Sequence, residues 1–230
     1  MAPIAANLQA VRARVERAAR AAGRAPAEIT LVAVSKTFPA EYIAQAHAAG
    51  QQVFGENYAQ EAVEKITKLA HLPLPLEWHF IGPIQSNKTS AIAAHFHWVH
   101  SVERDKIAQR LNAARPEGLP PLDVCIQVNV SGERSKSGVA PGEETRLADA
   151  IARLPRLRLR GLMAIPEPTT DATLARRRCA LLRELKDKLA AHGHALDTLS
   201  MGMSDDLEAA IAEGATMVRV GTAIFGQRKP

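Results

Sequence analysis

Short β-type segments alternate with helical segments along almost the whole of this chain. Each β-type run is rich in β-branched and other apolar residues, and a stretch with helical periodicity follows it. The predicted strands are Ile29–Ser35, Gln52–Gly55, Glu77–Gly82, His97–Val102, Leu122–Val130, Leu157–Ile165, Thr198–Gly202 and Met217–Phe225. The predicted helices are Ile4–Ala22 before the first strand, then Ala40–Ala49, Ala59–Leu69, Ser86–Ala94, Glu103–Ala113, Glu143–Leu154, Thr173–Ala191 and Asp205–Ala212.

Strands that alternate with helices predict a parallel sheet, because each helix carries the chain back to the start of the next strand. Eight such units within 230 residues predict one α/β domain over residues 1–230, a closed (β/α)8 TIM barrel with an extra N-terminal helix. An open, doubly wound sheet is the main alternative. If such a sheet bound a dinucleotide, a glycine-rich turn would follow its first strand, where this chain has Ser35-Lys36-Thr37-Phe38-Pro39.

The composition is that of a globular protein with no membrane segment. Hydrophobic residues make up 47% of the chain, which is enough for a sizeable core. No apolar run is long enough to cross a membrane, and residues 1–25 lack the apolar centre of a signal peptide. Cys125 and Cys179 lie far apart without the spacing of a metal site, so we expect two free thiols. These features predict a cytoplasmic protein.

The positive charge of the chain does not indicate a nucleic-acid partner. The formal net charge is +5, but the arginines fall on helical segments among alanines. Aromatic residues make up only 4% and are not interleaved with the basic ones, so the chain offers no platform for stacking bases. Solvated helix faces explain the charge, and we expect no nucleic acid to bind.

A lysine stands at the end of the first predicted strand. Lys36 follows the apolar run Ile29–Ser35, and α/β proteins place their chemistry at such strand ends. An amine held against an apolar wall loses its proton more readily, because desolvation disfavours the ammonium form. The neutral amine is the nucleophile that forms Schiff bases with aldehydes. A strand-ending lysine that simply points into water is the alternative.

Polar residues follow the other predicted strands as well. In a barrel the C-terminal ends of all strands meet at one mouth, so these side chains are predicted to face one cavity together with Lys36. They are Glu56 and Asn57, then Gln85, Ser86 and Asn87, then Ser135, Lys136 and Ser137, then Met201 to Asp205, and finally Gly221 and Thr222.

Two segments near the C-terminus have the features of a phosphate site. Ser204 is predicted to cap the helix that starts near Asp205, and a helix start offers unpaired N–H groups. Gly221 allows backbone amides to approach a ligand closely. Barrel enzymes often bind phosphate with the loops after strands seven and eight, where both segments lie. Plain capping and a tight turn are the alternatives, and Asp205 and Asp206 suit the helix dipole.

Arg219 lies within the last predicted strand, among Met217, Val218 and Val220. A buried charge is costly unless it is paired or hydrogen-bonded. Either an ion pair inside the barrel or a guanidinium directed at a ligand ring would satisfy it.

The histidines do not predict a metal site. His95 and His97 would share one face of a strand while His100 points to the other, which is poor geometry for three ligands. We expect partly exposed histidines at the bottom of the barrel instead. His79 lies in an apolar strand and is predicted to be a hydrogen-bonded core or mouth residue.

Several stretches of the chain, from the first predicted strand to Arg228, together form a recognisable pattern. They are LVAVSKTFP, FGENYAQE, WHFIGPIQSNK, VCIQVNVSGERSKSG, GLMAIP and LSMGMSDDLEAAIAEGATMVRVGTAIFGQR. These stretches resemble the pyridoxal phosphate homeostasis protein family, which has the alanine-racemase-type barrel and holds pyridoxal 5′-phosphate (PLP).

The resemblance implies a set of cofactor-binding residues. PLP would form a Schiff base with Lys36, and Asn57 would lie near its ring. Ser204, Gly221 and Thr222 would hold the phosphate through hydroxyl and backbone donors.

Arg219 would meet the pyridine nitrogen of PLP. Arginine stays charged and can only donate, so it would keep that nitrogen unprotonated and weaken the ring as an electron sink. Racemases with this fold add a tyrosine base from a second domain, whereas this chain ends four residues after Gly226 and has two tyrosines. Tyr42 is predicted to lie on a helix, and Tyr58 is the one placed near the mouth.

The chain departs from a common family pattern at Phe38, where a lysine is frequent. Lys88 and Lys136 are the alternative secondary amines. The function implied by the resemblance is PLP homeostasis in the cytosol, as a carrier or buffer without substantial turnover. Apo forms of PLP-dependent enzymes would receive the cofactor, and we expect a monomer. A weak PLP-dependent amino-acid racemase is the alternative.

Overall fold

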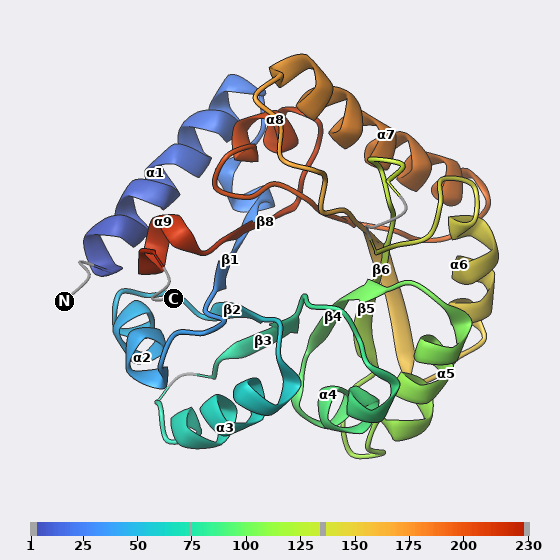
Figure 1. Cartoon of the computed structure of the whole chain (residues 1–230), viewed down its shortest axis with the longest axis horizontal. Coiled ribbons are helices and arrows are strands. Elements are labelled where there is room, and N and C mark those ends of the chain that lie inside the picture. The colour runs from blue at the N-terminus through green and yellow to red at the C-terminus, as the bar shows by residue number, and fades with distance from the viewer. Residues whose placement is uncertain (1–3, 74, 134–136, 228–230) are drawn as a thin grey trace.

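The computed structural model describes residues 4–73, 75–133 and 137–227. Eight parallel strands close into a barrel in chain order, from β1 next to β2 around to β8 next to β1 (Figure 1). The strands are β1 Thr30–Val34, β2 Val53–Glu56, β3 Glu77–Phe80, β4 Trp98–Val102, β5 Leu122–Gln127, β6 Leu157–Met163, β7 Thr198–Ser200 and β8 Met217–Val220. This confirms the predicted closed barrel and excludes the open sheet.

Helices surround the barrel (Figure 1). On the outer side of the barrel, helix α1 lies beside both α8 and α9. The α-helices are α1 Ile4–Ala21, α2 Ala40–Ala48, α3 Ala59–Leu69, α4 Thr89–His95, α5 Asp105–Ala114, α6 Glu144–Ala152, α7 Ala172–Ala191, α8 Leu207–Ala212 and α9 Thr222–Phe225. Two short 3-10 helices precede β1 and α4, at η1 Pro26–Glu28 and η2 Ser86–Lys88.

The hydrophobic core is divided into two parts by the wall of strands. Alternate residues of a strand face opposite sides, so Val218 and Val220 join the large cluster between strands and helices, whereas Met217 faces the interior. The interior cluster also contains Val32, Trp98, Cys125 and Met163. The barrel is therefore filled by side chains below its mouth.

Helix α1 packs on the barrel through one apolar face. Leu8, Val11 and Val15 recur at the spacing that places them on one side of a helix, and all three are buried. Arg14 on this helix donates to both carboxylate oxygens of Glu208 in α8. The extra N-terminal helix is thus part of the fold and fixes the segment that follows β7.

The last predicted strand was too long. It was predicted over Met217–Phe225, but β8 ends at Val220 and residues 222–225 form α9. The N–H groups of Ile224 and Phe225 both donate to the carbonyl oxygen of Gly221, which closes a helical turn. Both side chains are buried. Their apolar character reflects packing outside the barrel rather than a longer strand.

None of the helices in the described part of the chain is both long and apolar enough to cross a bilayer. Both cysteines are free thiols, as predicted, and the structure shows that both are buried. Burial raises the pKa of the Cys179 thiol to about 12, so this thiol stays protonated.

A close approach of β6 to β7 requires glycine at position 161. A Cβ on Gly161 would lie 1.8 Å from the carbonyl oxygen of Thr198, its partner across the sheet. We expect Gly161→Ala to lower the free energy of unfolding by about 3 kcal/mol or more, because two strands must move apart. Denaturant unfolding measures this. The control is Gly118→Ala, where a Cβ meets nothing within 4 Å and stability should be unchanged; equal effects would contradict the argument.

Candidate functional site

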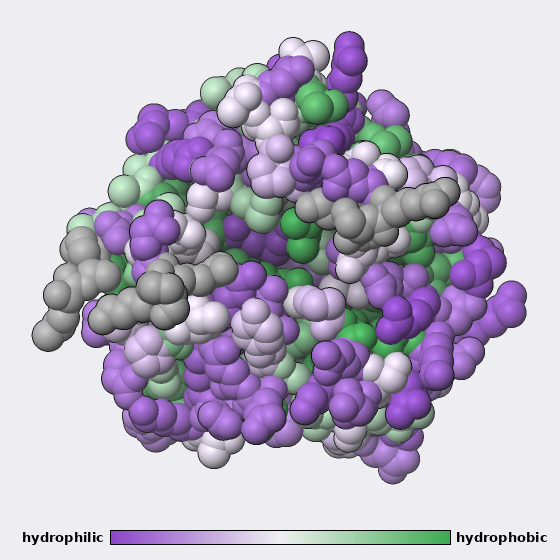
Figure 2. All heavy atoms as spheres, in the orientation of Figure 1, coloured by the Kyte–Doolittle hydropathy of each residue, from purple (hydrophilic) through white to green (hydrophobic). Residues whose placement is uncertain are grey.

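Five of the six predicted site residues follow the neighbouring strands β7, β8, β1 and β2, and the sixth, Arg219, lies within β8. The register pairs Ala33 with Val220 and Val34 with Gly55, so the ends of these strands lie at one level. Lys36 and Asn57 therefore extend from adjacent strand ends, and Gly221 extends from the strand on the other side of β1. In the view of Figure 2, polar and apolar side chains lie next to one another around the centre of the barrel.

Lys36 is half-buried in a turn of unusual backbone conformation. The next residue, Thr37, has φ of 67°, in the left-handed region that β-branched residues rarely adopt. Two side chains from helix α3 hold this turn. Lys65 Nζ donates to the carbonyl oxygen of Ser35 at 2.8 Å, and Glu61 Oε1 accepts from the N–H of Thr37 at 2.7 Å. Both peptide groups that flank Lys36 are thereby fixed.

A buried ion cluster lies behind this turn. Lys65 Nζ also contacts Glu56 Oε1 at 2.7 Å and Glu61 Oε1 at 2.5 Å. Ser35 Oγ donates to the same oxygen of Glu56. Burial raises the pKa of Glu56, although Lys65 favours the ionised carboxylate. Neither Lys65 nor Glu61 was predicted as part of the site. Their spacing of four residues on a predicted helix was the available signal.

Asn57 directly follows β2 and has an unsatisfied polar atom. Its Oδ1 is buried and has no hydrogen-bond partner among the described residues. Gly82, after β3, packs against the backbone of Asn57 so closely that a Cβ would lie 2.3 Å from its carbonyl oxygen. Asn57 is therefore held in place from behind while its side-chain oxygen still lacks a donor, which is a feature of a binding site.

The loop between β7 and α8 is held from both sides. The backbone N–H of Arg219 donates to the carbonyl oxygen of Gly202. On the other side, the guanidinium of Arg14 on α1 donates to the carbonyl oxygen of Ser204 at 2.7 Å. Ser204 was predicted to be the helix cap, and this was wrong. Helix α8 begins at Leu207 with Asp206 in the cap position. The Asp206 carboxylate accepts from the N–H of Met203, in the loop that precedes the helix.

Gly221 and Thr222 lie at the start of α9, where Thr222 is exposed. The first N–H groups of a helix have no carbonyl partner within the helix, so they are available to a ligand. Phe38 connects this segment to the lysine turn, since its ring lies 5.4 Å from that of Phe225 and 5.7 Å from that of Tyr42. The aromatic residue that replaces the frequent lysine thus packs between α2 and α9.

Arg219 is buried inside the barrel and its guanidinium is held by neutral groups. Nη1 donates to Ser200 Oγ at 2.7 Å, and Nη2 donates to the carbonyl oxygen of Ala164 at 2.9 Å. No carboxylate of the described residues forms an ion pair with it, so the ion-pair alternative is excluded for this part of the chain. Burial lowers the pKa of Arg219 to about 10, and the group stays charged at neutral pH.

The three clustered histidines do not come together in the structure as the ligands of a metal site would. His95 and His97 are exposed, whereas His100 is fully buried inside the barrel, so the prediction of exposure was wrong for His100. His79 is a hydrogen-bonded core residue, as predicted. The described residues contain no group of three metal-ligating side chains.

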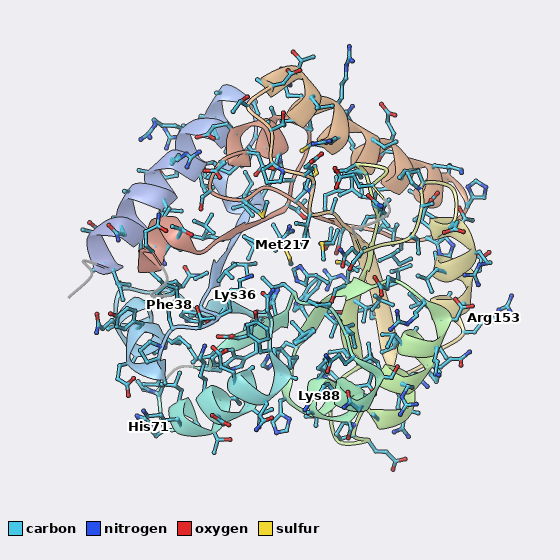
Figure 3. The ribbon with its side chains drawn as sticks, in the orientation of Figure 1. Lys36, Phe38, His71, Lys88, Arg153 and Met217 are labelled. Atoms are coloured by element: carbon cyan, nitrogen blue, oxygen red, sulfur yellow. The ribbon has the colours of Figure 1, made fainter. Side chains whose placement is uncertain are left out.

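Lys88 and Lys136 are the alternative amines predicted from the sequence. In Figure 3, Lys36 and Met217 are labelled near the centre of the barrel, while Lys88 lies out at helix α4. Lys136 and Ser135 lie outside the described residues. Lys36 is thus the lysine that the described mouth presents toward the barrel interior.

Loss of Lys65, the cation behind the lysine turn, should destabilise the protein. We expect Lys65→Met to lower the free energy of unfolding by about 3–5 kcal/mol, because the buried Glu56 carboxylate loses its counter-ion. Chemical denaturation checks this. Lys68→Met is the matched control on the same helix; its ion pair with Glu41 is exposed, and the unfolding midpoint should not move. Similar losses in both variants would refute the role of the cluster.

The chain is similar to known proteins over nearly its whole length. The family model for the alanine racemase N-terminal domain matches residues 6–229. The pyridoxal phosphate homeostasis protein of Pseudomonas aeruginosa is 63% identical over 228 residues, covering 99% of this chain and 97% of that protein. The protein of the same name from Escherichia coli K12 is 55% identical over 233 residues, with 99% and 98% covered.

Solved structures give the same result. PipY of Synechococcus elongatus, determined with PLP bound, superposes with a TM-score of 0.84 at 36% identity, covering 97% of this chain and 100% of that one. Alanine racemase from Corynebacterium glutamicum, at 17% identity and a TM-score of 0.70 over 96% of this chain and 62% of its own, shares the fold. The barrel and these relatives show that the chain belongs to the pyridoxal phosphate homeostasis protein family.

Proposed function

We propose that this protein binds PLP through Lys36 and carries or buffers it in the cytosol, acting as a single-domain monomer. The observation that carries the proposal is the fixed position of Lys36, whose two flanking peptide groups are held by Lys65 and Glu61 at the mouth of the barrel. The names of the relatives and the PLP-bound PipY structure support the same ligand. Two free thiols suit a reducing compartment.

The residues at the mouth fit the chemical groups of PLP. When bound, PLP supplies an aldehyde that a primary amine can hold as a Schiff base. The unsatisfied Asn57 Oδ1 can accept from a polar group near the ring. The first N–H groups of α9, with the hydroxyls of Ser204 and Thr222, suit the phosphate, because the start of a helix favours an anion.

The environment of Arg219 favours storage over turnover. A guanidinium donates to the pyridine nitrogen and offers it no proton, so the ring stays a weak electron sink. The two tyrosines are placed for other roles, since Tyr42 stacks on Phe38 and the side chain of Tyr58 is 54% exposed. We therefore rank weak racemase activity below the carrier function, in which apo enzymes receive the cofactor.

The anchor is tested by absorption spectroscopy of the protein mixed with PLP. We expect a Schiff-base band that borohydride abolishes, with the reduced adduct on the peptide containing Lys36, because this amine is fixed at the mouth. Lys36→Ala should lose both signals. Lys88→Ala is the control for the alternative amine and should match the wild type. An unchanged band in Lys36→Ala would remove the functional proposal and leave the fold intact.

Carrier and enzyme are separated by two further measurements on the PLP-loaded protein. A carrier should deliver PLP to an apo PLP-dependent enzyme faster than it releases PLP to an aldehyde-trapping reagent. A racemase should introduce solvent deuterium at the α-carbon of an amino acid, with loss of exchange in Lys36→Ala. We expect delivery and no exchange; exchange with catalytic turnover, or delivery no faster than release, would contradict the carrier function.

A further inference from the structure

A continuous chain of hydrogen bonds crosses the interior of the barrel and ends at Arg219. Arg219 Nη1 contacts Ser200 Oγ at 2.7 Å, and Ser200 Oγ contacts His100 Nδ1 at 2.7 Å. His100 Nε2 lies 2.8 Å from His79 Nδ1, and His79 Nε2 lies 2.9 Å from Glu77 Oε1. The chain thus joins strands β8, β7, β4 and β3, and all of its members except Glu77 are buried.

The two ends of the chain differ in exposure and position. Glu77 is the first residue of β3, so it lies at the end of the barrel opposite the mouth, and 45% of its side chain is exposed. Arg219 is 4% exposed and lies on the side of the site proposed above. Trp98 stacks on His79 with ring centroids 5.4 Å apart, and this contact holds the His79 ring in place.

The chemistry of each member fixes the direction of every donor. A carboxylate can only accept, so His79 carries its proton on Nε2. Burial lowers the pKa of His79 and lowers that of His100 well below its ordinary value, so both rings are neutral at pH 7. His79 Nδ1 then accepts from His100 Nε2–H, and His100 Nδ1 accepts from the Ser200 hydroxyl. The Ser200 oxygen is left to accept from Arg219.

All four donors therefore point the same way, from Arg219 toward Glu77. Hydrogen bonds in such a chain polarise one another, which makes the Ser200 oxygen a better acceptor for the guanidinium. If His79 lost the Glu77 carboxylate, the tautomers could reverse, and His100 would then donate to Ser200 as well. Ser200 would receive two donors, and the bond that holds Arg219 would weaken.

We propose that Glu77, His79, His100 and Ser200 are positioning residues that fix the Arg219 guanidinium for donation to the ring nitrogen of PLP. The inference rests on the proposed function for its ligand, while the direction of the chain is a property of the protein alone. Glu77 would influence the cofactor from the far end of the barrel without touching it.

The first test is nitrogen-15 NMR of the histidine rings in the protein without ligand. We expect His79 and His100 to be neutral with the proton on Nε2. In Glu77→Met both should populate the Nδ1–H tautomer, because the acceptor that fixes His79 is gone. Glu117→Met is the matched control; its carboxylate is 86% exposed, pairs with Arg156 and should leave both rings unchanged. A wild-type His100 with its proton on Nδ1 overturns the proposal.

The second test is the affinity for PLP, measured by titration of the Lys36-linked absorbance. Glu77→Met should bind PLP about fivefold more weakly, the equivalent of one lost hydrogen bond. Ser200→Ala interrupts the chain beside Arg219, so it should weaken binding similarly while His79 keeps its proton on Nε2. Wild-type affinity in both folded variants overturns the proposal.

The two arms separate this inference from the proposed function. The NMR arm reads the protein without ligand, so a reversed His100 tautomer defeats the chain even where PLP is bound through Lys36. A wild-type protein that shows the expected tautomers but forms no reducible band with PLP defeats the proposed function. In that case the role toward PLP fails with it.

Discussion

The pairing of β1 with β8 is the constraint on which the site depends. Thr30 to Ala33 align with Met217 to Val220, and this closes the barrel between segments near opposite ends of the sequence. Closure places the lysine turn after β1 next to the helix that starts after β8. Without it, the amine and the proposed phosphate-binding amides would belong to separate edges of an open sheet.

Two polar groups are then buried on either side of this seam, and the protein stabilises them by different means. Lys65 lies outside the barrel wall between two carboxylates, Glu56 and Glu61, so its charge is compensated locally. Arg219 lies inside and is held by a hydroxyl and a carbonyl. The first arrangement fixes the backbone of a turn. The second leaves a guanidinium with no carboxylate partner among the described residues, which suits an electron-rich ring nitrogen.

The sequence was sufficient to predict the barrel, because the alternation of strands and helices is a local pattern. It also showed which residues follow the strands, but the expectation that Glu56 faces the cavity was wrong, since its carboxylate joins the ion cluster outside the barrel wall. The helix Ala59–Leu69 was predicted with its observed bounds, since its apolar face and its ends are encoded within the segment. The errors arose where packing between distant segments decides the outcome. Ile224 and Phe225 are apolar because α9 is buried outside the barrel. Ser204 lies in the loop before α8, where its carbonyl oxygen accepts from Arg14 of the distant helix α1. The pair of Lys65 with Glu61 follows the four-residue spacing of one helix. The other bonds of Lys65, and both bonds of His100, join different elements, so no spacing within one element predicts them.

The contact between Arg14 and the loop after β7 bears on the order of folding. Arg14 and Ser204 are 190 residues apart in the sequence, and the hydrogen bond between them joins α1 to the segment proposed to face the phosphate. Contacts of such high sequence separation form late, because a long loop must close first. During synthesis on the ribosome Lys36 emerges early, but its partners after β7 and β8 emerge last. If PLP binds as proposed, the complete site therefore forms only after nearly all of the barrel has been translated.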